Sequence, residues 1–272
     1  NTIANKRLVA VHTFGARSEG TSMAERRAKR GGRSERLAKR AAKPAIDPCP
    51  PGQIGGAYKP LTEHESQRIY GTALDLLENL GMGDVPKRLK QDLLAVGAVD
   101  NGTGRLCFPT VVVEKAIDQA AKTFVLHGRD AARSIEVGGN RVHFGTGGAA
   151  VQTLDLDSAI YRPSTLKDLH DFTRLQDTLA NVSWFTRCCV ATDVPDNFDL
   201  DVNTVYALLK NTTKPTATSL TIAEQVGPII KMLDIAAGGP GEFSKRPFMK
   251  AHISPVISPM RYGEDAVDVV YE

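Results

Sequence analysis

Apolar residues recur at helical spacing from about Lys59 onward. Behind the capping box Thr62-Glu63-His64-Glu65, one helical face collects Ile69, Ala73, Leu76, Leu77 and Leu80. Gly81 can then end this helix in the left-handed conformation. The pattern predicts a second helix from about Pro86 to Val96 and a third after Pro109, through Val113, Ala116, Ile117 and Ala120. We therefore expect residues 59–133 to form a helical N-terminal layer.

The pattern changes to β signals over Ser134–Thr153. The segments SIEVGG and RVHFG flank Gly138-Gly139-Asn140, which predicts a hairpin turn. A second, short hairpin is predicted from AVQTLDLDS and LDLDSAIYRP.

Strand and helix patterns then alternate to the end of the chain. A strand at RVHFGT precedes a helix over Ser164–Ala180, which we expect to turn Leu169, Phe172, Leu175 and Leu179 inward. Strands at 182–190, 214–220 and 247–253 precede helices near 199–210, at 221–237 and from Glu264. The helix at 221–237 carries a second capping box, Thr221-Ile222-Ala223-Glu224.

The strand starts at 182, 214 and 247 recur every 32–33 residues, which is the spacing of βα units in a parallel sheet. The fold class is therefore α/β. The most frequent closed form is the TIM-type (β/α)8 barrel, and an open, doubly wound sheet is the alternative. Only four units are present, and the sequence breaks off inside a helical pattern. We expect residues 134–272 to be the first half of a barrel that continues for on the order of four more units.

Charge separates the start of the chain from the rest. Residues 1–43 hold 12 Lys and Arg against 3 acidic residues, whereas the other 229 residues hold 22 against 28. With little to bury, residues 1–58 are expected to be a basic, mostly disordered tail, and Met23 is the expected natural start. The tail has no interleaved aromatic residue, which disfavours nucleic-acid binding. It also has no apolar core of a secretory signal after Met23. No apolar run approaches the ~20 residues of a membrane span, and four irregularly spaced Cys indicate a reducing, cytoplasmic compartment.

Several familiar motifs are incomplete. Gly145–Ala150 superficially matches a dinucleotide fingerprint, but a β-hairpin pattern follows where a helix is required, so close backbone approach is the better interpretation. The six His show no metal-ligand spacing, so no metal site is predicted. Cys188 and Cys189 point to opposite faces of their strand and are interpreted as structural.

In βα barrels, functional side chains lie at the carboxyl ends of strands. This rule selects eight candidates: Thr146, Gly147, Arg187, Asp193, Ser219, Thr221, His252 and Ser254. The capping box already explains Thr221, and His252, at a strand end just before Ser254-Pro255, is the strongest candidate.

Segments throughout the chain resemble the trimethylamine methyltransferase family. They are the basic RRAKRGGR, then YKPLTEHESQRIYGTALDLLENLGM, the Gly145–Ala150 glycines, RPSTLKDLHDFTRLQDTLANV, DLDVNTVYALLKNTTKP and HISPVISPM. The resemblance runs from about Met23 to the end and lies in many weak segments. That family has a TIM barrel in a chain nearly twice this long, and includes pyrrolysine-bearing members and relatives without pyrrolysine.

The resemblance implies methyl transfer from a small methylated amine to a corrinoid (cobalamin) carried by a separate partner protein, with no cofactor bound directly. It leaves open trimethylamine or a quaternary amine such as glycine betaine. We also expect a homo-oligomer. A quaternary ammonium needs aromatic faces and a nearby carboxylate, which suggests Trp184, Phe185 and Tyr206 with Asp193. Arg187 and His252 are the candidate donors to a betaine carboxylate. The expected substrate-binding set is Thr146, Gly147, Trp184, Arg187, Asp193, Ser219 and His252, with catalytic residues beyond Glu272.

Two alternatives from other classes stay open. One is a different TIM-barrel enzyme that binds a phosphorylated substrate at Gly145–Gly148. The other is a non-catalytic protein that binds nucleic acid through the basic tail, which the acidic body disfavours.

Overall fold

The computed structural model describes Leu37, Asp47 and residues 49–272. The chain divides into two units, 1–48 and 49–272. The expectations for Met23 and for the basic tail up to residue 48 lie outside the described residues, Leu37 and Asp47 excepted.

The three helices predicted for residues 59–133 are present. Helix α3 (Glu63–Asp75) begins at a complete capping box, in which the Thr62 hydroxyl accepts from the Glu65 N–H and the Glu65 carboxylate accepts from the Thr62 N–H at 2.8 Å. One π-helical turn, η1 (Leu76–Leu80), extends it to Gly81, whose φ of 70° lies in the left-handed region. The other two predicted helices are α4 (Lys87–Ala95) and α5 (Thr110–Gln119).

Two hairpins that the sequence pattern did not predict join this layer to the last part of the chain. They are β2 (Val99–Asp100) with β3 (Leu106–Cys107), and β12 (Val256–Ile257) with β13 (Arg261–Tyr262). The guanidinium of Arg105 donates to the carbonyls of Leu80, Gly81 and Met260, so one side chain connects both regions.

The turn at Gly138-Gly139-Asn140 is present, but the predicted hairpin around it is wrong. Strand β5 (Ile135–Gly138) pairs with β4 (Thr123–Leu126), and β6 (Arg141–Val142) pairs with β1 (Gln53–Ile54), both antiparallel. Each strand therefore satisfies its backbone groups with a partner far from the turn. The second predicted hairpin is confirmed as β7 (Gln152–Leu154) with β8 (Tyr161–Pro163).

A parallel sheet of three short strands follows: β9 (Phe185–Thr186), β10 (Thr216–Ser219) and β11 (Met249–His252), in the order β11-β10-β9. The predicted strand RVHFGT contributes less than expected, since its first residues belong to β6. Beside β9, single parallel bridges join Gly145 to Trp184 and Ala150 to Cys189. The parallel elements thus neighbour one another in chain order.

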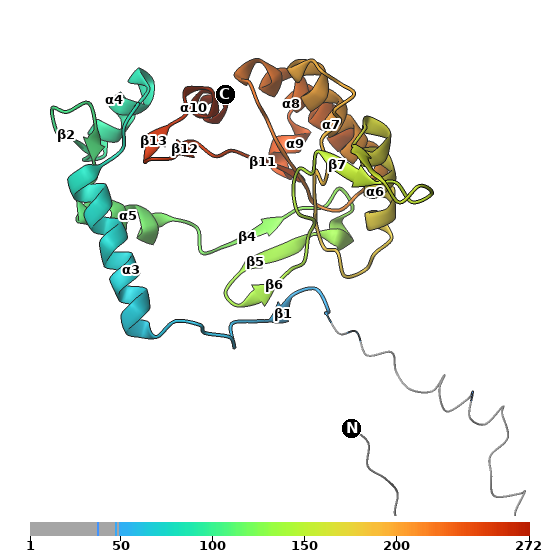
Figure 1. Ribbon diagram of the computed structural model, residues 1–272, viewed down its shortest axis with the longest axis horizontal. Coiled ribbons are helices and arrows are strands. Elements are labelled where there is room, and N and C mark those ends of the chain that lie inside the picture. Colours follow the sequence, from blue (N-terminus) through green and yellow to red (C-terminus); the bar gives the residue numbers. More distant parts are fainter. Residues whose placement is uncertain (1–36, 38–46, 48) are drawn as a thin grey trace, which may run out of the picture. The chain divides into compact units, whose positions relative to one another are not determined.

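Helices α6 (Leu166–Asp177), α7 (Asn197–Asn211), α8 (Val226–Ala237) and α9 (Glu242–Lys245) lie together (Figure 1), and α10 (Glu264–Tyr271) ends the chain. Helices α6 to α9 and the sheet enclose two apolar clusters. One centres on Val205, Ile229, Leu233, Phe243 and Phe248, the other on Leu169, Phe185, Cys189, Ala207 and Leu208.

Two local expectations about these helices are wrong. Leu175 and Leu179 are exposed, because the buried face of α6 runs through Leu169 and Thr173, and Leu175 is turned about 200° from Thr173. The second capping box does not form either. Asp201 accepts both the N–H and the hydroxyl of Thr221, and α8 is preceded by the short 3-10 turn η3 (Ala223–Gln225) with no side-chain cap.

Candidate functional site

The parallel sheet has one face against the helices and one face away from them. Phe185 and Met249 pack into the two apolar clusters, so they mark the helix-facing side. Side chains alternate along a strand, and the register pairs Ser219 with His252 and Ala217 with Lys250. Trp184, Lys250 and His252 therefore share the opposite face.

A cavity of about 690 Å³ opens at the carboxyl ends of β10 and β11. Its walls come from the glycine-rich loop, the two strands and the start of α10. The lining residues are Gly148, Ala149, Ser219, Leu220, Lys250, Ala251, His252, Ile253, Ser254 and Ala266. The cavity therefore lies where a βα protein places its functional groups.

Trp184 contacts two residues that line this cavity, Lys250 and His252, and packs closely against Gly145. A Cβ atom built on Gly145 would lie 2.2 Å from Cε2 of the indole, so only glycine allows the ring this position. This confirms the close backbone approach predicted for the glycine-rich segment. The His252 ring meets the indole edge-on, with centroids 6.5 Å apart and planes at 78°.

Lys250 was not a candidate from the sequence, yet it is the cation of this cavity. Its Nζ lies 4.6 Å from the centroid of the Trp184 ring. Within residues 49–272 no ion pair joins Lys250 to a carboxylate. Burial lowers the pKa of His252 below its usual value, and the charges of Lys250 and Arg187 lower it further. His252 is therefore a neutral ring near pH 7, able to donate one hydrogen bond.

Thr146, Gly147 and Ser219 lie around the same strand ends. The Thr146 hydroxyl accepts from the Thr186 N–H at 2.8 Å and donates to the Thr186 carbonyl at 2.7 Å. These two hydrogen bonds fix the glycine-rich loop to β9. Gly147 faces open space, and Ser219 lines the cavity.

Arg187 lies on the other side of its strand. Its side chain is only 9 % exposed, and Nη1 is 3.8 Å from Oδ1 of Asp201, a fully buried residue of α7. Burial raises the pKa of Asp201, and the hydrogen bonds from Thr221 and the charge of Arg187 oppose that shift. The structure therefore pairs Arg187 with a helix residue and does not bring it onto the face of Trp184.

The other proposed cage residues do not accompany Trp184. Phe185 is 1 % exposed in the core, and Tyr206 is exposed on α7 beside Lys210. Asp193 accepts a hydrogen bond from the Leu166 N–H at 2.8 Å, at the first turn of α6. Of the aromatic residues chosen from the sequence, Trp184 alone lies beside the cavity.

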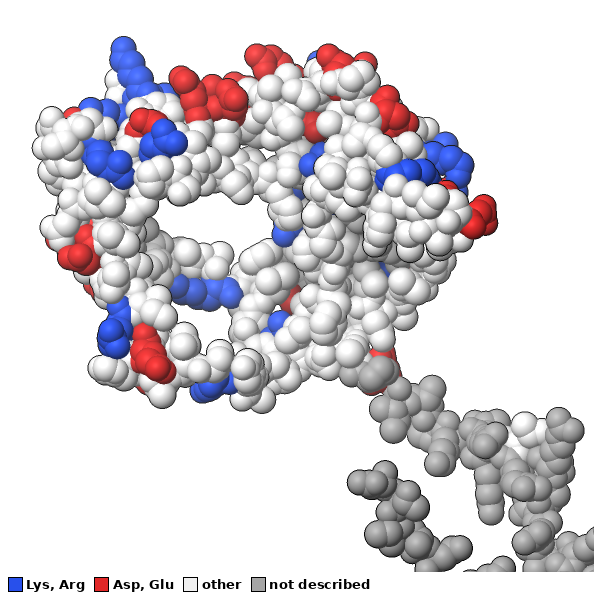
Figure 2. Space-filling view, in the orientation of Figure 1, with Lys and Arg blue, Asp and Glu red and all other residues white. Residues whose placement is uncertain are grey.

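Cys188 and Cys189 carry free thiols, Cys189 within the core. In the part of the chain that the structure describes, no three metal-ligating side chains gather, and no helix is long and apolar enough to cross a bilayer. Figure 2 shows Asp and Glu gathered along the upper edge of the face in view, and Lys and Arg mixed with acidic residues over the rest of the described residues.

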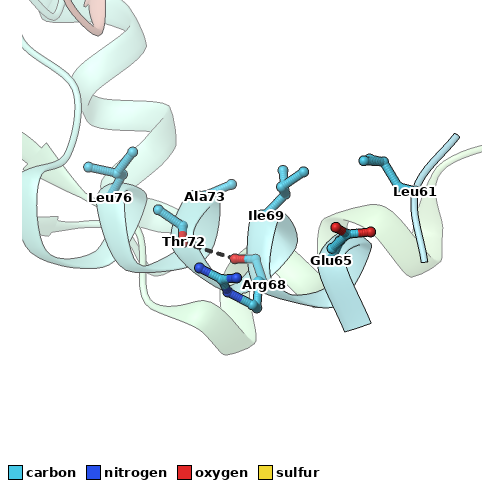
Figure 3. A pocket seen from close by; sticks show the side chains of 7 residues that line it. All are labelled: Leu61, Glu65, Arg68, Ile69, Thr72, Ala73 and Leu76. Atoms are coloured by element: carbon cyan, nitrogen blue, oxygen red, sulfur yellow. Dashed lines mark hydrogen bonds between the residues drawn. The ribbon is translucent and has the colours of Figure 1, made fainter. Parts of the chain in front are cut away.

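A second groove, of about 580 Å³, runs along α3 (Figure 3). Its residues are Leu61, Glu65, Arg68, Ile69, Thr72, Ala73 and Leu76. The apolar face predicted for this helix thus exists but stays open, since Ile69 is 60 % exposed and Leu74 is the buried residue of α3.

The sequence profile of the trimethylamine methyltransferase family matches residues 29–272. The chain belongs to the trimethylamine methyltransferase family. It is 27% identical over 212 residues to the trimethylamine methyltransferase MttB of Desulfitobacterium hafniense, a match that covers 78% of this chain and 42% of that protein. It is 24% identical over 214 residues to the glycine betaine methyltransferase of Desulfitobacterium hafniense, a match that covers 78% of this chain and 44% of that protein. It is 26% identical over 214 residues to the trimethylamine methyltransferase MttB of Methanosarcina thermophila, a match that covers 77% of this chain and 44% of that protein. The chain therefore spans less than half the length of these relatives.

Proposed function

We propose that this protein takes part in moving a methyl group from a small methylated amine to a corrinoid on a separate protein. The observation that carries the proposal, beside the family membership, is Trp184, an indole held next to a strand-end cavity by Gly145. A methylated ammonium with no N–H to donate is recognised best by the face of an aromatic ring, and Trp is the strongest such ring.

The residues of the cavity suit a positioning role. Transfer of a methyl group needs the carbon aligned with its acceptor, and most of the barrier can be met by orientation. His252 meets the indole edge-on and limits where a ligand can lie, while Thr146 fixes the loop that carries Gly145. The lining residues Ser219 and His252 offer hydrogen-bond donors to polar groups of the amine.

The corrinoid, when its carrier protein docks, supplies a reduced cobalt centre that accepts the methyl group. A cofactor that arrives on another protein needs an accessible mouth. Gly147 faces open space, and Ala149 and Ser254 are exposed at the rim. These features fit delivery from outside.

We propose that the parallel elements are part of a (β/α)8 barrel. The parallel elements lie side by side in the same order as in the chain, from Gly145 through β9 and β10 to β11. This is the arrangement of a singly wound sheet. A doubly wound sheet reverses its order at a switch point, and no reversal occurs among the described parallel strands. Among the amines, we propose a quaternary one such as glycine betaine.

The test measures methylation of Co(I) cobalamin with trimethylamine and glycine betaine, in the wild type and in Trp184→Leu. A desolvated cation–π contact of about 2 kcal/mol corresponds to roughly a 30-fold weaker binding of a quaternary amine after the ring is removed. Tyr206→Leu is the matched control, because Tyr206 is an exposed aromatic residue on α7 outside the cavity. Equal effects of the two substitutions would contradict the proposal.

A further inference from the structure

The cavity beside Trp184 carries positive charge without a balancing carboxylate. Its ten lining residues include Lys250 and no Asp or Glu. Arg187 and Asp201 pair with each other on the helix-facing side. Asp193, the counter-charge suggested by the resemblance, is bound at the start of α6.

The ammonium of Lys250 occupies the position that a ligand's ammonium needs. Its Nζ, 4.6 Å from the ring centroid of Trp184, already uses the aromatic face. A simple methylated cation would have to displace this ammonium and then stay beside it, and like charges at such a distance repel each other. A ligand that brings its own anion removes that conflict, because the displaced ammonium then gains a partner.

We infer that Lys250 is a specificity-determining residue, which admits a methylated ammonium only when the same molecule carries a carboxylate. The ligand's ammonium takes the face of Trp184, and Lys250 turns on its flexible stem to pair with the carboxylate. This inference rests on the proposed function. It gives Lys250 the carboxylate-binding role that the resemblance suggested for Arg187, whose guanidinium is buried against Asp201.

His252 supports the same assignment. It lies two residues beyond Lys250 on the same face of β11 and lines the same cavity. As a neutral ring it adds no second positive charge, and its N–H can donate to a carboxylate oxygen. One cation and one neutral donor, on neighbouring positions of one strand face, suit a carboxylate better than a bare ammonium.

Binding is measured directly, apart from catalysis, by calorimetric titration and by the emission of Trp184, the single Trp of this chain. The probes are glycine betaine, tetramethylammonium and inorganic phosphate. The wild type is expected to bind glycine betaine at least about 10-fold more tightly than tetramethylammonium.

Three variants separate charge from shape. Lys250→Met keeps the stem and removes the charge, so glycine betaine should bind about 10-fold or more weakly and tetramethylammonium more tightly. Lys250→Arg should again bind glycine betaine more tightly than tetramethylammonium, as the wild type does. Lys231→Met removes a charge from the exposed face of α8 and should change neither affinity.

The outcomes are distinguishable. If both amines bind and Lys250→Met changes their affinities equally, or not at all, the role of Lys250 is refuted while the proposed function stands. If neither amine binds the folded protein or alters the Trp184 emission, the proposed function itself fails. Phosphate binding tighter than that of glycine betaine, lost in Lys250→Met, would overturn both in favour of a phosphorylated substrate.

Discussion

Replacing Gly145 with Ala tests how the indole of Trp184 is held. The added Cβ would lie 2.2 Å from Cε2, 2.4 Å from Nε1 and 2.6 Å from Cδ2 of the ring. Ordinary carbon contacts are about 3.5–4.0 Å, so the ring must move by about 1 Å or the loop must move away from β9. The φ angle of Gly145 lies outside the left-handed region, so the effect is steric and does not come from backbone strain.

The cost follows from overpacking. Forcing an extra methyl group into a filled site costs about 1–3 kcal/mol. In a unit of this size, each kcal/mol lowers the melting temperature by about 2–4 °C. A displaced indole also loses its contacts with Lys250 and His252, so its emission should change.

Gly147→Ala is the matched control. It lies in the same loop, and an added Cβ there meets no atom within 4 Å. Its stability should stay within about 0.5 kcal/mol of the wild type. Urea unfolding followed by circular dichroism gives the stabilities, and Trp emission reports the ring. Wild-type stability and emission in Gly145→Ala would refute the close packing of the loop on Trp184.

Three further substitutions probe the supporting structure, each by urea unfolding. Thr62→Ala should destabilise the protein by about 1 kcal/mol, because it removes the hydroxyl that accepts from the Glu65 N–H, and an unchanged midpoint of urea unfolding would contradict this. The hydrogen bonds of Arg162 lower the pKa of Asp168, so their stabilisation is present above the unfolded pKa of about 3.9 and is lost as the pH falls through the lower, folded value. Asp168→Asn should therefore be less stable than the wild type at pH 7, and the difference in unfolding free energy should become smaller well below pH 4. A difference that does not change with pH would contradict a contribution from the Asp168 carboxylate. Asp201→Ala should cost on the order of 3 kcal/mol, because Arg187 is left buried without its carboxylate, and a loss below 1 kcal/mol would show that the pair at 3.8 Å contributes little.

Local signals in the sequence predicted the elements whose ends are decided locally. The box at Thr62-Glu65 starts α3 as expected, because both of its bonds lie within four residues. The same signature at Thr221 failed, since Asp201, twenty residues earlier on α7, takes the Thr221 hydroxyl and N–H. A long-range carboxylate can thus override a local cap, and a linear pattern contains no sign of it.

The candidate site shows the same division. Strand alternation already implied that Trp184 and Arg187 point to opposite faces, so the two could not line one pocket together. The pattern did not say which face the helices cover, and that choice brought Lys250 into the site and placed Arg187 outside it. Phe185 and Tyr206 were chosen by residue type alone, and residue type carries no information about burial.

The three hydrogen bonds of Arg105 have a consequence for the order in which the chain is completed during synthesis. Two of its acceptors, Leu80 and Gly81, are made before it, but the third, Met260, follows 155 residues later. At about 5–20 residues per second, a ribosome needs roughly 8–30 s to reach that carbonyl. During this interval the Arg105 guanidinium lacks its third acceptor. The helices α6 to α8 emerge in the same interval and can pack first. The helical layer is therefore early in sequence but among the last parts of this fold to be closed.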